Sequence, residues 1–103
     1  MGDRLETLRS LAAARPGDVF AHYALAMELA GGGQLEEALA EFGQVLSLDP
    51  DYSVAYFQTG QLLERLGRTE EARRIYQQGV EVTSRLRQRH AQDQLVDALA
   101  RLG

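Results

Sequence analysis

Two histidines and a few carboxylates are the side chains that could carry acid–base or metal chemistry. His22 and His90 lie far apart in the sequence, and neither belongs to a helical metal motif such as H-E-x-x-H, so each is expected to be a packing or surface histidine. Asp49 and Asp51 flank a proline, an arrangement typical of turn and capping residues rather than of a catalytic carboxylate pair. Glu64 is the one passable candidate for a general acid or base.

Cysteine and lysine are both absent, and all 11 basic residues are arginine. The missing cysteine excludes disulfides, thiol nucleophiles and cysteine-ligated metals. The missing lysine excludes Schiff-base chemistry and the lysine of a phosphate-binding loop. The run Gly31–Gly33 follows a predicted helix, so a helix-ending turn explains it better than a phosphate loop does. We therefore expect no enzyme activity, no metal and no cofactor.

Composition and charge favour a globular protein without a nucleic-acid or membrane partner. The hydrophobic share of 45% is ordinary for a folded domain. The net charge of −4 argues against the basic stripe that nucleic acid requires. No apolar run approaches the roughly 20 residues needed to cross a bilayer. Residues 1–6 carry acids and no apolar core, so we expect no secretory signal and a cytoplasmic location.

The elements that must position these residues follow an internal repeat with a spacing of 34 residues. The matching pairs include Pro16 and Pro50, Ala21 and Ala55, Leu29 and Leu63, Gly33 and Gly67, Ala38 and Ala72, and Phe42 and Tyr76. A glycine after an apolar helical stretch can adopt the left-handed conformation that ends a helix. Alanine is small where two antiparallel helices approach closely. The repeat therefore predicts a recurring helix–turn–helix unit.

Apolar spacing predicts six helices and no strands, over residues 3–14, 19–31, 35–48, 53–66, 69–85 and 88–102. Thr69 is predicted to cap the fifth helix, and Asp51 or Ser53 the fourth. The boundary between the fifth and sixth helices is the least defined. Residues 83–90 contain neither glycine nor proline, so the fifth helix could run on past residue 85 before turning.

A 34-residue unit with these landmarks resembles the tetratricopeptide repeat. In the first repeat, residues 19–52, the signature positions are Leu25, Ala26, Leu29, Ala38, Phe42, Val45 and Pro50. In the second, residues 53–86, they are Tyr56, Gly60, Leu63, Ala72, Tyr76 and Gly79. Five positions depart from the family pattern: His22 replaces an aromatic residue, Val45 and Gly79 an alanine, Thr59 a leucine and Ser84 the closing proline.

The resemblance implies an all-α fold, a right-handed stack of antiparallel helix pairs with about six helices in a single domain over residues 1–103. Residues 1–18 fit an N-terminal half-repeat helix, and residues 87–103 fit a C-terminal capping helix. Such stacks usually need about three repeats for stability. Two whole repeats with a half-repeat and a cap just meet that requirement.

The first helix of each pair lines a concave groove in this family, where partners usually lie. The resemblance thus implies a protein–protein interaction module or scaffold for an unidentified protein or peptide. The groove positions carry over to Phe20, Tyr23, Met27, Ala30, Val54, Phe57, Gln61, Glu64 and Arg65, and the last helix could add Ala91 and Leu95. An aromatic and apolar surface with a polar edge suits an extended peptide or an amphipathic helix. The family's lysine–asparagine clamp for a C-terminal carboxylate is missing.

Two alternatives stay open for these residues. Phe20 and Phe57 could be core residues between helices instead of groove residues. The chain could also be a self-associating structural subunit, such as a homodimer, because terminal repeats without a polar outer face tend to associate.

A basic cluster is a second candidate surface, formed by Arg73, Arg74, Arg85, Arg87, Arg89 and His90. It could bind an acidic protein or a phosphate group. The favoured alternative is a solvated face, partly paired with Glu70, Glu71 and Glu81 at helical spacing, as in Glu70–Arg74 and Glu81–Arg85.

Overall fold

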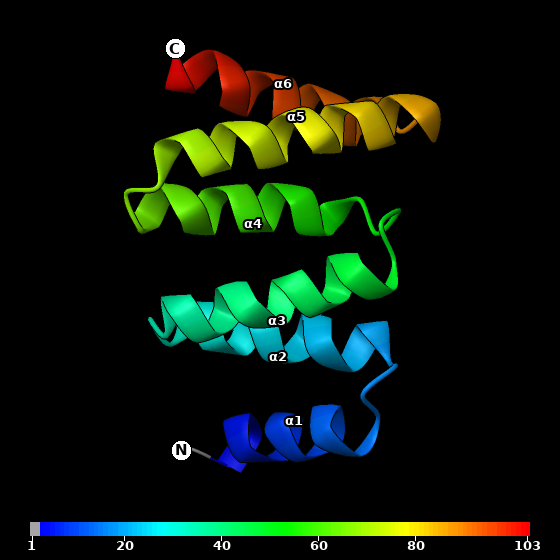
Figure 1. The fold of residues 1–103 in the computed structure, drawn as a ribbon, viewed down its shortest axis with the longest axis vertical. Helices are drawn as coiled ribbons and strands as arrows, with labels where there is room; N and C mark the ends of the chain where they lie inside the picture. The colour runs from blue at the N-terminus through cyan, green and yellow to red at the C-terminus, as the bar shows by residue number, and fades with distance from the viewer. Residues whose placement is uncertain (1–2) are drawn as a thin grey trace. The chain divides into compact units, whose positions relative to one another are not determined.

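The computed structural model describes residues 3–103, which form six α-helices and no strands. The helices are α1 (Asp3–Ala14), α2 (Val19–Gly31), α3 (Leu35–Leu48), α4 (Val54–Arg65), α5 (Thr69–Arg85) and α6 (Arg89–Leu102) (Figure 1). The chain divides into two compact units. The first unit ends at Asp49 and holds α1–α3, and the second begins at Pro50 and holds α4–α6.

The predicted all-α fold is confirmed, and so are the predicted helices. Four of the six coincide with their predicted bounds. Helix α4 lies one residue inside its predicted range at each end, and α6 begins one residue later than predicted. The first two residues of the predicted N-terminal half-repeat lie outside the described residues. The division of residues 1–103 into one domain with these repeats stays a prediction.

In the first unit, α2 and α3 pack as an antiparallel pair and α1 packs against α2 (Figure 1). The core of the pair consists of Ala21, Leu25, Ala26, Leu29, Ala38, Phe42 and Val45, none more than 4% exposed. Helix α1 adds one buried side chain, Ala12, while Leu5, Leu8 and Leu11 are half-buried. Within this unit, α1 is therefore held by less buried apolar surface than α2 or α3.

In the second unit, α5 packs against both α4 and α6. Its core includes Ala55, Leu62, Leu63, Ala72, Tyr76, Leu95 and Ala98. Gly60 of α4 lies against the ring of Tyr76, because a Cβ atom at Gly60 would stand 2.1 Å from Tyr76 Cε1. Gly79 of α5 lies similarly against α6, where a Cβ would stand 2.9 Å from Leu95 Cδ1. These two glycines allow the neighbouring side chains to reach the helix backbone.

Three helices end in the same hydrogen-bonded turn. Gly33 and Gly67 adopt left-handed conformations with φ of 80° and 76°. The amide of the following residue then bonds back into the helix, as Gln34 N does to Leu29 O at 2.9 Å. At the end of α5 the left-handed residue is Arg87, with φ of 58°, and Gln88 N donates to Thr83 O at 2.8 Å. The fifth helix therefore stops at Arg85 without a glycine.

Replacing Arg87 with glycine should stabilise the second unit. A side chain in the left-handed region costs roughly 1 kcal/mol, which glycine avoids. Arg87 is also exposed, so little packing is lost. We expect the thermal midpoint, followed by circular dichroism, to rise by about 4–8 °C per kcal/mol gained. A lower midpoint for Arg87→Gly would show that the arginine side chain makes a larger contribution than its backbone strain costs.

The predicted cap of α5 was wrong, and that of α4 was right in position but not in its hydrogen bond. Thr69 is the first residue of α5, and the cap position is held by Arg68 without a side-chain cap bond. Ser53 occupies the cap position of α4 but its hydroxyl does not cap the helix. Asp18 does cap α2, since its carboxylate accepts from the amides of Phe20 and Ala21 at 3.0 and 3.3 Å.

Candidate functional site

One face of α2 carries the three groove residues predicted in the first unit. Phe20 is 70% exposed and Met27 is 39% exposed, while Tyr23 is half-buried. The Tyr23 ring stands edge-on to Phe42, with centroids 6.0 Å apart and planes at 66°. The alternative that Phe20 is a core residue is wrong. Spacings of three and four residues place the three side chains on one face of the helix.

In the second unit, the predicted residues of α4 differ in exposure. Val54 is 45% exposed, Gln61 and Arg65 are exposed, and Phe57 is half-buried. The Phe57 ring packs beside Tyr76, with centroids 6.2 Å apart. Phe57 thus shares an aromatic contact with the core and presents only part of its ring to solvent.

A surface pocket of about 270 Å³ gathers part of this set. It is lined by Gln61, Glu64 and Arg65 of α4 and by Arg101 of α6. The sequence predicted the first three residues and missed Arg101. In the sequence, Arg101 only lies next to the apolar stripe of the last helix. That position does not indicate that α6 contacts α4.

Glu64 is held inside this pocket by two partners. The Tyr76 hydroxyl donates to Glu64 Oε2, and Arg101 Nη1 lies 3.9 Å from Glu64 Oε1. Burial, followed by the bond to this carboxylate, raises the pKa of Tyr76 well above its usual value. Tyr76 therefore remains a hydrogen-bond donor at any physiological pH. Glu64, the candidate acid or base, serves here as the acceptor that fixes a core tyrosine.

Leu95 does not belong to a binding surface. It is 1% exposed and packs beside Gly79, so its expected contribution to the groove was wrong. Ala91 is half-buried. The groove as a whole, with Phe20, Tyr23, Met27, Val54, Phe57, Gln61, Glu64 and Arg65, stays a prediction.

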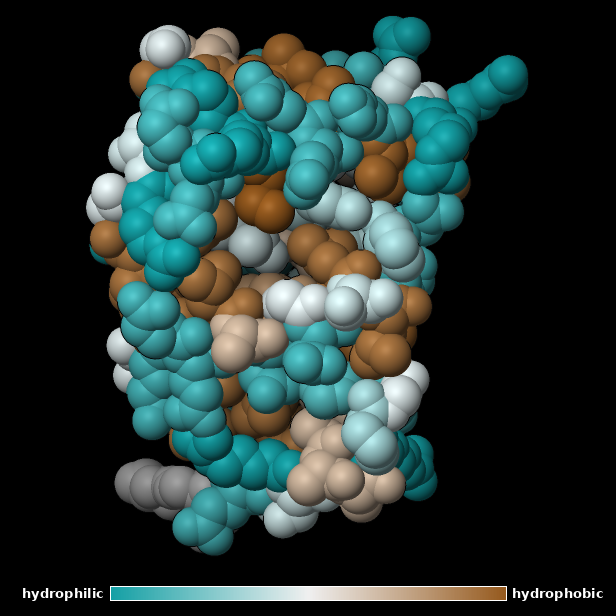
Figure 2. All heavy atoms as spheres, viewed as in Figure 1, coloured by the Kyte–Doolittle hydropathy of each residue, from teal (hydrophilic) through white to brown (hydrophobic). Residues whose placement is uncertain are grey.

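Hydrophobic residues also reach the surface elsewhere. Leu48 on α3 and Val96 on α6 are 41% and 45% exposed. On the face drawn in Figure 2, hydrophobic residues appear as separate patches bordered by hydrophilic ones. Leu48 and Val96 can therefore serve as controls when the predicted binding residues are substituted.

The arginines of the predicted basic cluster pair in part with the expected glutamates, but not in the two pairs that the spacing predicted. Arg85 Nη2 bonds to Asp51 Oδ1 at 2.5 Å, and this bond lowers the pKa of Asp51. Arg73 Nε lies 3.5 Å from Glu70 Oε2, at a spacing of three residues instead of four. The predicted pairs Glu70–Arg74 and Glu81–Arg85 were therefore wrong. Arg87, Arg89 and His90 are exposed.

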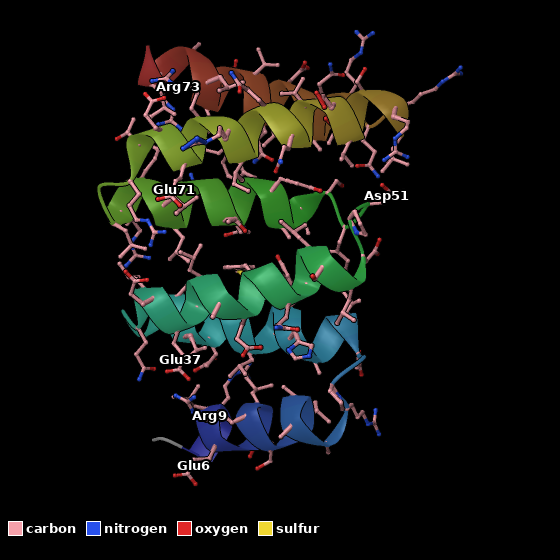
Figure 3. The ribbon with its side chains drawn as sticks, viewed as in Figure 1. Glu6, Arg9, Glu37, Asp51, Glu71 and Arg73 are labelled. Atoms are coloured by element: carbon pink, nitrogen blue, oxygen red, sulfur yellow. The ribbon has the colours of Figure 1, made fainter. Side chains whose placement is uncertain are left out.

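Within each unit, ion pairs join residues that are close in the sequence as well as residues that are distant in it. Arg9 of α1 and Glu37 of α3 point toward one another and form a bidentate pair (Figure 3). Arg68 Nε donates to Glu71 Oε2 at 2.6 Å, which lowers the pKa of Glu71.

A second pocket, of about 420 Å³, lies in the first unit. It is lined by Arg9, Ala12, Ala13, Pro16, His22, Leu25, Glu41 and Gln44. His22 is 7% exposed, with Nδ1 2.7 Å from Glu41 Oε1 and Nε2 2.8 Å from the carbonyl oxygen of Pro16. The sequence predicted a packing or surface histidine; the packing alternative is confirmed, but its partners were missed.

Two classes of site have no counterpart in residues 3–103. In this part of the chain no three histidine, aspartate or glutamate side chains are grouped so that they could hold a metal ion. None of the described helices combines the length and the apolar character needed to cross a membrane.

Comparison with known proteins shows that this chain is similar to tetratricopeptide-repeat proteins in sequence and in fold. A family model described as tetratricopeptide repeat matches residues 29–102. An uncharacterized protein of Methanocaldococcus jannaschii is 35% identical over 65 residues, covering 63% of this chain and 76% of that protein. The crystal structure of a tetratricopeptide repeat domain protein from Salinibacter ruber is 38% identical, with a TM-score of 0.77 and coverage of 82% and 94%. A solution structure from Bordetella parapertussis is 26% identical, with a TM-score of 0.82 and coverage of 95% and 85%.

Proposed function

Because the chain belongs to the tetratricopeptide-repeat family, we propose that it is an interaction module that binds a segment of another protein and catalyses nothing. The fold generally mediates protein–protein interaction. The observation that carries the proposal is the exposure of Phe20, 70%, on the same face of α2 as the exposed Met27. Burying such a side chain against a partner contributes about 1.5–3 kcal/mol. An exposed aromatic residue beside a methionine is typical of a contact surface.

The second unit carries a proposed contact surface of its own, in which polar residues accompany an apolar one. Gln61, Arg65 and Arg101 line the pocket of α4 and α6, and Val54 lies exposed at the start of α4. A guanidinium or amide group can fix a backbone or side-chain group of a bound peptide. The two faces, on α2 and on α4, are proposed as the partner-binding residues of their units.

Self-association is the alternative, and the surface of the last helix does not favour it. The exposed residues of α6 include Asp93, Gln94 and Asp97, with Val96 and Ala100 as the apolar exceptions. A polar outer face is what a capping helix needs to remain soluble without a further repeat. We therefore favour a different protein or peptide as the partner over a second copy of this chain. We also propose a cytoplasmic location and no nucleic-acid or membrane partner, consistent with the net charge of −4.

Selection from a displayed library of random 15-residue peptides tests the proposal. Peptides selected on the unmodified chain should bind Phe20→Ser and Met27→Ser at least about tenfold more weakly, a loss of 1.4 kcal/mol. Titration calorimetry would measure the affinities. The melting temperature of Phe20→Ser should change little, because its ring is mostly in solvent.

Matched controls come from exposed apolar residues outside the first helix of each pair. Leu48→Ser on α3 and Val96→Ser on α6 should bind the same peptides within about threefold. Equal binding by all four variants would remove α2 from the proposed surface. A dimer in native-mass measurements that is lost in Phe20→Ser would instead make self-association the function of this face.

A further inference from the structure

In both repeats, a side chain of the first helix of the pair forms a hydrogen bond with a backbone carbonyl of the preceding turn. We call this bond the tie. His22 and Tyr56 occupy equivalent positions, and so do Pro16 and Pro50. The Tyr56 hydroxyl donates to the carbonyl oxygen of Pro50 at 2.7 Å. His22 Nε2 lies 2.8 Å from the carbonyl oxygen of Pro16. One repeat therefore makes this bond with a phenol and the other with an imidazole.

The imidazole has a second contact that the phenol cannot have. His22 Nδ1 lies 2.7 Å from Glu41 Oε1 of α3, and the equivalent position in the second repeat is the apolar Ile75. A carboxylate and a backbone carbonyl are both hydrogen-bond acceptors. A neutral imidazole has one N–H group, whereas an imidazolium has two. Only protonated His22 can donate to Glu41 and to Pro16 at once.

The charges around His22 favour that protonated form. Glu41 of α3 and Asp18, the cap of α2, are the acids that act on the ring. Arg9 of α1 lines the same pocket, but its guanidinium is bonded to Glu37. The bond to Glu41 raises the pKa of His22 above its ordinary value, against the opposing effect of burial.

We propose that protonated His22 is a pH-dependent tie that fixes the α1–α2 turn to α3, and that its deprotonation loosens the docking of α1. We expect the effect on α1 because Ala12 is its one buried side chain among the described residues. Its ion pairs, Arg9–Glu37 and Arg4–Glu28, are partly exposed, so each adds little to its docking. The tie is complete below the ordinary pKa of histidine. It is lost as the pH rises through the raised pKa of the folded state.

Hydrogen exchange of the whole chain, followed by NMR from pH 5.5 to 8.5, tests this tie. After correction for intrinsic exchange rates, protection of the α1 and turn amides should fall about tenfold as His22 loses its proton. Protection in α5 should not follow the same titration. The ring carbon shifts of His22 give its pKa in the same samples, and we expect that pKa to lie above about 6.5.

Three variants separate the tie from a general effect of pH. Glu41→Gln removes the carboxylate and should move the loss of protection to lower pH. His22→Tyr installs the residue of the second repeat and should abolish the pH dependence. His90→Gln, on the exposed surface of α6, should behave as the unmodified chain does. Protection of α1 that is constant with pH, or that falls identically in Glu41→Gln, would overturn the proposal.

Discussion

An arginine in place of Ala72 should remove a large part of the free energy of unfolding of the second unit. Ala72 is completely buried, so the new side chain has no space and its charge has no water. Overpacking and an unpaired buried charge together cost about 3–5 kcal/mol. A domain of this size has a free energy of unfolding of only about 5–15 kcal/mol. We expect a large loss of helical signal, or a much lower urea midpoint, by circular dichroism.

The repeat provides an equivalent test and two controls. Ala38, equally buried in the first unit, should respond to Ala38→Arg in the same way. The exposed alanines Ala40 and Ala100 accept an arginine at the surface, so Ala40→Arg and Ala100→Arg should change the free energy of unfolding by no more than about 0.5 kcal/mol. Near-native melting of Ala72→Arg would mean that the assigned repeat register is wrong.

The substitution Gly60→Ala should also destabilise the second unit, by about 2 kcal/mol or more. Its Cβ atom would lie 2.1 Å from Tyr76 Cε1 and 2.5 Å from Cζ. The Tyr76 ring cannot readily move aside, since it is completely buried and its hydroxyl is bonded to Glu64. The cost of severe overpacking therefore exceeds the gain of roughly 1 kcal/mol that alanine brings to a helix. Urea unfolding measures the difference.

The same substitution at Gly43 of α3 should have the opposite effect on stability. It lies within a helix, and nothing stands within 4 Å of the Cβ atom that alanine would add. We expect Gly43→Ala to stabilise the chain by about 0.5–1 kcal/mol, through helix propensity alone. If Gly60→Ala stabilised the chain as Gly43→Ala does, the contact between Tyr76 and the backbone of α4 would be absent in solution.

The sequence predicted the helices well because the signals that define them are local. Apolar residues recur at helical spacing, and Gly33 and Gly67 mark two of the turns by their conformational freedom. The buried alanines Ala38 and Ala72 were also predicted, since the repeat places them at equivalent points of both helix pairs.

The turn after α5 and the helix caps were less predictable. Arg87 adopts a left-handed conformation without being glycine, so composition gave no signal there. Thr69 and Ser53 are suitable capping types, but whether a hydroxyl reaches an amide depends on the backbone of the turn. Likewise Arg85 pairs with Asp51, which is distant in sequence, and not with a glutamate of its own helix.

The candidate site was predicted only in part, for a related reason. The exposure of Phe20 follows from its place on the helix face opposite the apolar stripe. The burial of Leu95 and the approach of Arg101 to Glu64 depend on how α6 packs. The bond between His22 and Glu41 joins two helices, and no local spacing rule indicates it.

The order of helix contacts within each unit has a mechanical consequence. Most contacts join sequence neighbours: α1 packs on α2 and α2 on α3 in the first unit, and α5 packs on α4 and α6 in the second. The Arg9–Glu37 pair between α1 and α3 and the contact between α4 and α6 are smaller additions. When a chain with such contacts is stretched from its ends, each helix can peel away before the next is loaded. No long-range strand pairing is present in residues 3–103 to resist shear. Under tension this protein should therefore lengthen at low force and shorten again quickly on release, in the manner of a soft spring.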